Sequence, residues 1–208
     1  LVTQSSQTDG TKTYFVYVND SAGNLGTSSP RHVTIDTGAP SVTINSPSAG
    51  WYGSNFLVNA TVTDSSLVST VQYRYENSTT NGSWSSMTNP SGNLWNATFV
   101  VTSVSEGNYT FRINATDSQG NGNTTVNVSN VGIDRTSPSA ITYVSPTPSN
   151  GSNQSSTSYT VNVTFTELNP YNCLLHNGTT NVTMTLSGST CLVTQSSQTD
   201  GTKTYFVY

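Results

Sequence analysis

Asparagines in the acceptor pattern for N-linked glycosylation are the residues of this chain with the clearest chemistry. Of the 23 asparagines, 14 stand in Asn-x-Ser/Thr with x other than Pro. Because Ser and Thr fill roughly a third of the chain, chance alone would give about seven or eight such sites. The excess predicts a glycosylated chain. The sites are Asn19, Asn59, Asn77, Asn81, Asn96, Asn108, Asn114, Asn123, Asn127, Asn150, Asn153, Asn162, Asn177 and Asn181.

The position of these asparagines within apolar patterns strengthens the prediction. Asn59, Asn96 and Asn114 each stand between two apolar residues in alternating segments. In a β-strand, alternate side chains point to opposite faces, so these asparagines should face solvent. The alternative is a polar surface that no glycosyltransferase meets.

The two cysteines, Cys173 and Cys191, are separated by 18 residues and predict a disulfide. Closing a loop of that length would contribute about 3 kcal/mol in the chain-entropy view. Disulfides persist in oxidising compartments, which agrees with the glycosylation pattern and predicts an extracellular or cell-surface location. Two cysteines without nearby histidines are a poor zinc site.

No constellation of residues predicts catalysis. His32 and His176 are the only histidines, and neither has a Cys or a second His at ligand spacing. No Gly-x-Ser-x-Gly or phosphate-binding loop is present. We therefore expect neither an enzyme nor a catalytic metal.

Two Asp-Ser-x-Gly-Asn turns, at 20–24 and 117–121, offer the hard oxygen ligands that calcium prefers. Asp36 and Asp134 stand in segments that follow them and could add carboxylates. Asp and Asn also form turns without any ion, and few carboxylates lie nearby. Ordinary turns are the favoured interpretation, calcium between domains is the alternative, and no cofactor is expected.

The composition is that of a neutral, hydroxyl-rich β protein. Only 8% of residues are charged, the formal net charge is −4, and 10% are aromatic. The few Lys and Arg form no basic patch, which argues against nucleic acid as a partner. No apolar stretch approaches the ~18–20 residues of a membrane span. Glycans would supply the solubility that charged side chains usually provide.

Alternating apolar residues predict the elements that carry these groups. Six segments have a strand pattern, and no segment has a sustained 3.6-residue period, so almost no helix is expected. Short strands separated by Gly/Asn/Ser turns predict an all-β sandwich. The predicted strands lie at 42–44 (ending before Pro47), 56–62, 71–75, 95–101, 109–115 and 126–133.

The chain also repeats itself. Residues 1–17 recur letter for letter as residues 192–208, so the period is 191 residues. Such a period indicates a tandem array. The stretch from Tyr14 to Asn24 matches 111–121, which divides each period into two domains of roughly 95 residues, one of them split across the chain termini.

The predicted boundaries follow from this match. Residues 37–135 form a complete domain A, residues 136–208 form the N-terminal part of domain B, and residues 1–36 form the C-terminal part of the preceding domain B. We favour an arbitrary window on a continuous chain. Exchange of strands between separate chains is the alternative.

Comparison of the two domains singles out an aromatic pair. Phe15 and Tyr17 occupy outward strand positions at which domain A has Arg112 and Asn114. Two outward aromatics on a hydroxylated surface predict a buried contact with a neighbouring domain or strand. Singly exposed aromatics are the alternative.

The motifs Tyr-Arg-Tyr, Ser-Trp-Ser-Ser-Met, Leu-Trp-Asn-Ala-Thr-Phe and Glu-Gly-Asn-Tyr-Thr-Phe-Arg-Ile-Asn-Ala-Thr-Asp between residues 73 and 117 carry a family resemblance. The chain resembles tandem immunoglobulin-like and fibronectin-III-like modules of prokaryotic cell-surface and filament proteins, and the dense sequons resemble archaeal ones. The resemblance implies two immunoglobulin-like β-sandwich domains per repeat.

The expected function is a structural repeat of a glycosylated extracellular filament or cell-surface stalk, with copies of itself as partners. The alternative is an adhesin or carbohydrate-binding repeat that uses Trp51, Trp84 or Trp95 as stacking platforms. Trp95 alternates with Ala97 and Phe99, which favours a core position for that residue.

Overall fold

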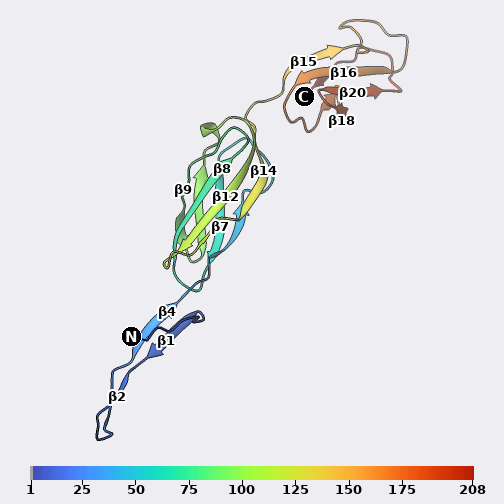
Figure 1. Ribbon diagram of the computed structural model, residues 1–208. Coiled ribbons are helices and arrows are strands. Elements are labelled where there is room, and N and C mark those ends of the chain that lie inside the picture. The colour runs from blue at the N-terminus through green and yellow to red at the C-terminus, as the bar shows by residue number, and fades with distance from the viewer. Residues whose placement is uncertain (1) are drawn as a thin grey trace. The chain divides into compact units, whose positions relative to one another are not determined.

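The computed structural model describes residues 2–208, which divide into two compact units (Figure 1). The first ends at Arg135 and the second runs from Thr136 to Tyr208. The described residues are almost entirely strand and turn, with one 3₁₀ turn at Val101–Ser103, which confirms the predicted all-β class. No helix among them has the length or apolar content to cross a membrane.

A sandwich of two sheets makes up most of the first unit. All strand pairs in it are antiparallel except β6–β14, which is parallel. One sheet has the order β10 (Thr88–Ser91), β11 (Leu94–Phe99), β7 (Phe56–Thr63) and β5 (Ser41–Ser46). The other has the order β6 (Gly50–Tyr52), β14 (Asn127–Ile133), β12 (Gly107–Asp117), β8 (Val68–Glu76) and β9 (Ser85–Ser86), with β13 (Gly122–Asn123) paired to β12.

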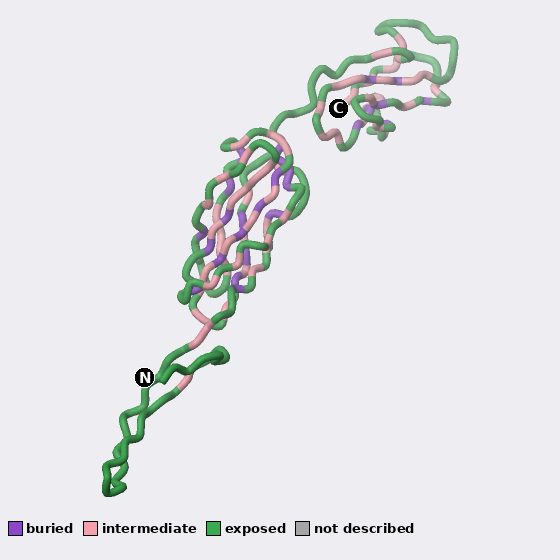
Figure 2. Tube along the Cα trace, viewed as in Figure 1, coloured by how far each residue is buried: buried purple, intermediate pink, exposed green. Residues whose placement is uncertain are grey.

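The core of this sandwich follows from the alternation in the sequence. Val58, Ala60 and Val62 of β7 have no exposed area, and Phe111 and Ile113 of β12 face them from the other sheet. In Figure 2 the buried positions lie along the strands of the two sheeted parts of the chain. The alternation therefore places every second side chain of β7 and β12 on the outer surface.

One predicted strand ends earlier than expected. The strand predicted for 95–101 stops at Phe99, and Val101 begins the 3₁₀ turn, where it is still buried. The amide of Val101 donates to Oδ1 of Asn55 (3.0 Å) instead of entering the strand ladder. Two apolar residues in succession, Val100 and Val101, break the alternation that a continuing strand would need.

The N-terminal segment of the first unit forms two short antiparallel ladders. β1 (Gly10–Tyr14) pairs with β4 (Arg31–Ile35), and β2 (Tyr17–Asn19) pairs with β3 (Leu25–Thr27). Nearly all of their residues are exposed (Figure 2). We call residues 10–35 the N-terminal hairpin.

The second unit is a smaller pair of sheets. One sheet has the order β15 (Ser139–Val144), β16 (Tyr159–Thr166), β20 (Thr190–Gln195) and β19 (Thr185–Ser187). The other has the order β18 (Asn181–Thr183), β17 (Leu174–His176) and β21 (Phe206–Val207). Its buried core is formed by Val161, Val163, Cys173, Leu175, Met184 and Cys191.

Candidate functional site

The fourteen sequon asparagines all lie at the surface of the described chain, and none of them is buried. In the strands this follows from alternation. Val58 and Ala60 have no exposed area, and Asn59 between them points outward. Asn114 likewise stands between two fully buried residues of β12. The strands thus present asparagines to solvent while their neighbours fill the core.

Two of the strand sequons are direct neighbours. Asn96 of β11 pairs with Asn59 of β7, and both lie on the outer face of the same sheet. Nδ2 of Asn45 donates to Oδ1 of Asn59 at 2.8 Å, which fixes the orientation of that amide. Directly opposed side chains in an antiparallel pair are about 5 Å apart at Cβ. Glycans attached to both asparagines would therefore project from this face of the sheet next to each other.

Sequons in turns have a different geometry. Asn77 accepts hydrogen bonds at Oδ1 from the amides of Thr79 (2.9 Å) and Thr80 (2.7 Å), which closes an Asx turn. The hydroxyl of Thr79, the third residue of the same sequon, also donates to that oxygen at 3.1 Å. Asn177 and Thr179 repeat this contact at 2.9 Å in the second unit. The two side chains that define each acceptor motif are therefore in contact.

Cys173 and Cys191 form a disulfide in the second unit. Their Cα atoms are 6.3 Å apart, and both residues are buried. Cys191 belongs to β20 of one sheet, and Cys173 immediately precedes β17 of the other. The bond therefore joins the two sheets through the core.

Phe15 and Tyr17 lie in the N-terminal hairpin, where they are about half exposed. Their rings meet edge to face, with centroids 5.0 Å apart. Val16 between them is also exposed, so this stretch between β1 and β2 is open to solvent on both sides. In the recurrence of this sequence, Phe206 is half exposed and its ring lies 4.8 Å from His176.

The two histidines lie in different units. The hydroxyl of Thr13 is 2.9 Å from Nδ1 of His32, and Oδ1 of Asn181 is 2.9 Å from Nδ1 of His176. Each contact joins neighbouring strands at the surface. Within residues 2–208, neither histidine belongs to a group of three metal-ligating side chains.

An acidic cluster was only partly anticipated from the sequence. Carboxylate oxygens of Asp36, Asp64 and Asp117 lie within 4.8 Å of one another. The sequence suggested Asp36 and Asp117, but Asp64 was missed, and its place just after the apolar run of β7 was the available signal. Three carboxylates supply only part of the six to eight oxygens that calcium requires. Any metal ion here would need further oxygen ligands.

Asp117 also shapes its own turn. Its Oδ1 accepts the amides of Gln119 (2.9 Å) and Asn121 (2.8 Å), and its Oδ2 accepts Nδ2 of Asn121 (2.8 Å). Burial raises the pKa of Asp117, but the hydrogen bonds from Asn121 and Gln119 outweigh it, so the pKa lies below the usual carboxyl value. The hydrogen bonds to Asn24 likewise lower the pKa of the exposed Asp20 in the equivalent turn of the hairpin.

A depressed folded-state pKa predicts acid destabilisation. The unfolded chain binds the proton first as pH falls, so the stability from Asp117 is complete above the ordinary carboxyl pKa near 4 and is lost as pH drops through the lower folded value. The midpoint of thermal unfolding should therefore fall between about pH 5 and pH 2. In Asp117→Asn, which should have a lower midpoint at neutral pH, this fall should be smaller.

Tryptophan fluorescence measures the unfolding of the first unit alone, because all 3 tryptophans lie in it. If the unfolding midpoint falls equally steeply with pH in the wild-type chain and in Asp117→Asn, Asp117 does not govern the acid destabilisation.

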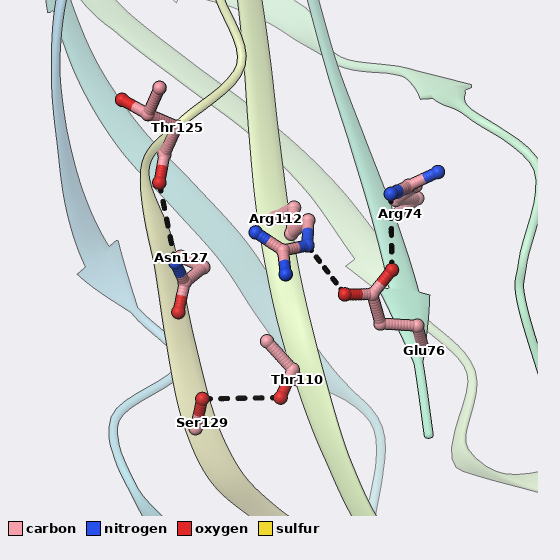
Figure 3. Close-up of polar contacts among 7 residues, drawn as sticks. All are labelled: Arg74, Glu76, Thr110, Arg112, Thr125, Asn127 and Ser129. Carbon is pink, nitrogen blue, oxygen red and sulfur yellow. Dashed lines mark hydrogen bonds and ion pairs between the residues drawn. The ribbon is translucent and has the colours of Figure 1, made fainter. Parts of the chain in front are cut away.

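A charged cluster lies on the outer face of β8 and β12 (Figure 3). Nε of Arg112 donates to Oε1 of Glu76 at 2.5 Å, and Nη2 of Arg74 lies 3.1 Å from Oε2 of the same carboxylate. The guanidinium of Arg74 also stacks over the Trp84 ring at 4.9 Å. The cluster fastens two strands together and leaves Glu76 shared between two cations. It contains no nucleophile or general base aimed at a cavity.

The three tryptophans differ in their exposure. Trp95 packs partly buried against the core, as its alternation predicted. Trp84 has one ring face covered by Arg74. Trp51 is 44% exposed, and it lies against Gly132, where an added Cβ would come within 2.3 Å of its ring. Of the three, Trp51 is therefore the most exposed to solvent.

Comparison with known proteins supports the fold. A family model described as bacterial Ig-like domain (group 3) matches residues 93–189, a range that covers the end of the first unit and the start of the second. No curated protein matches.

Two solved structures illustrate what this chain is similar to. The tetra-tandem repeat in the extending region of a large adhesion protein is 18% identical over 98% of this chain and 57% of its own, with a TM-score of 0.44. The chain therefore spans little more than half of that structure. Fibronectin(III)-like modules of Clostridium thermocellum CbhA are 19% identical over 80% of this chain and 84% of theirs, with a TM-score of 0.45. The strand order and the matching family model together identify the fold as immunoglobulin-like β-sandwich.

Proposed function

We propose that this chain is a structural repeat unit of a glycosylated extracellular filament or cell-surface stalk. The observation that carries the proposal is the recurrence of residues 1–17 as residues 192–208 in an immunoglobulin-like chain. Repeats in such arrays contact mainly their neighbours, so copies add length without new chemistry. The partners of the unit are then further copies of itself.

The surface supports an extracellular array. None of the fourteen sequon asparagines is buried, and Asn59 and Asn114 alternate with core residues in their strands. With only 8% charged residues, glycans would keep such a surface soluble. A disulfide joining the sheets suits an oxidising environment. The density of sequons is also our reason for favouring an archaeal cell surface. The proposal includes no catalytic role and no cofactor besides the covalent glycans.

Glycopeptide mass spectrometry of the protein from its native source tests this proposal. Chymotryptic peptides with Asn59, Asn96 and Asn114 should carry glycan mass. The chain provides matched controls in Asn45 (Asn-Ser-Pro) and Asn89 (Asn-Pro-Ser), which lack the acceptor motif and should be unmodified. Unmodified asparagines at all fourteen sequons would contradict a glycosylated array.

A carbohydrate-binding or adhesive module is the second candidate, and the exposure of Trp51 is the observation that favours it. Exposed aromatic rings stack on sugars and on partner surfaces. If this candidate is correct, the chain should bind members of a glycan panel, and Trp51→Ala should abolish binding while Trp95→Phe retains it. Absence of binding to every glycan favours the structural role.

A further inference from the structure

The N-terminal hairpin reproduces the last two long strands of the first unit's sandwich. In the hairpin, Gly10 pairs with Ile35 and Lys12 pairs with Val33. In the sandwich, the matching positions of β12 and β14 pair in the same order, Gly107 with Ile133 and Tyr109 with Val131. The two ladders therefore share their register over these pairs, up to the register shift between Tyr109 and Phe111 in the sandwich.

The turn of the hairpin is also the same. The amide of Asp20 donates to the carbonyl of Asn24 at 3.1 Å, and the amide of Asp117 donates to that of Asn121 at 3.1 Å. Both aspartates then accept the Nδ2 group of their asparagine at 2.8 Å. The segment is thus formed like the β12–β14 connection down to its side-chain contacts.

What differs is burial. Tyr14, Val16 and Val33 of the hairpin are 52%, 57% and 45% exposed, whereas their counterparts in β12 and β14 are fully buried. Those counterparts are Phe111, Ile113 and Val131. A two-stranded hairpin is marginally stable in water, and an apolar face of this kind marks a contact surface. The hairpin therefore needs a partner that covers this face.

The second unit has the complementary arrangement. Its sheets β15-β16-β20-β19 and β18-β17-β21 follow the order of β5-β7-β11-β10 and β9-β8-β12. Val207 of β21 pairs with Leu175 of β17, as Ile113 of β12 pairs with Tyr73 of β8. Among the described residues, however, β21 is an edge strand, whereas β12 has β14 on its other side.

We propose that the N-terminal hairpin completes the sandwich of a second copy of this repeat, docking on residues 136–191 of the copy that precedes it in the array. Sequence identity supports this partner, because β21 lies in residues 192–208 and has the sequence of Phe15 and Val16, the two hairpin residues that follow β1. These two residues take the place of β21 beside β17, and β4 covers the open edge. The proposal rests on the tandem-array function and assigns one domain to two successive copies.

The test adds the sequence of residues 18–36 after Tyr208 of the full chain, so that the second unit has its own copy of β4. The control carries the same extension with Val33→Asp and Ile35→Asp in the added segment. With the apolar extension, hydrogen exchange at the amides of Phe206 and Val207 should slow by at least about 100-fold, and the added β4 sequence should become protected. In the control, neither should change.

Equal exchange rates in the two extended chains would overturn the proposal. Dimers joined through exposed N-terminal hairpins, with an unprotected extension, would also overturn it, since the hairpin would then have another partner. The measurement uses unglycosylated protein, so its outcome is independent of whether the native array carries glycans. Failure of this inference and failure of the proposed function are therefore distinguishable.

Discussion

Replacing Phe111 with alanine should lower the free energy of unfolding of the first unit by about 3–5 kcal/mol. The side chain has no exposed area, and its ring lies 4.9 Å from Phe99 and 5.7 Å from Phe56. Truncation removes these aromatic contacts and leaves a cavity between the two sheets. Urea denaturation followed by tryptophan fluorescence measures the effect, because every tryptophan belongs to this unit.

The control for this prediction is the same substitution at an exposed position. Phe15 is 46% exposed, so Phe15→Ala should change the stability of the sandwich by less than about 0.5 kcal/mol. A loss of similar size in both variants would contradict the assignment of Phe111 to the centre of the core.

Breaking the disulfide should lower the stability of the second unit by about 3 kcal/mol. The bond closes a loop between residues separated by 18 positions and joins two small sheets whose shared core is limited. Reduction of the wild-type chain and the double variant Cys173→Ala, Cys191→Ala should give similar losses. Differential scanning calorimetry with and without reductant measures this effect.

The first unit is the internal control for that measurement. Its tryptophan-detected transition should be unchanged by reductant, because both cysteines lie in the other unit. An unchanged second unit after reduction would show that its apolar core alone maintains the fold.

Much of the fold could be predicted from the sequence because local patterns determined it. The alternation through Val58 and Ala60 placed β7 in the core and Asn59 outside, and Phe111 and Ile113 did the same for β12. The pairing of the only two cysteines was equally direct. In each case the prediction needed only the residues of one strand, or the one pair of cysteines in the chain.

Features that depend on non-local contacts could not be predicted. Three-residue β6 pairs in parallel with β14, and a segment so short contains no alternation to reveal it. Asp64 joins Asp36 and Asp117 only because the ends of distant strands converge. The stacking of Arg74 over Trp84 similarly depends on how the segment after β8 folds back. Contacts between segments far apart in the chain leave no recognisable spacing pattern in a single sequence.

Cryo-electron microscopy of the native assembly tests the central claim most directly. A glycosylated array of these repeats should appear as a continuous filament or stalk with two sandwich domains per repeat and extra density on Asn59, Asn96 and Asn114. Discrete particles with bare asparagines and an exposed Trp51 engaged by a ligand would contradict the structural array and favour a binding module.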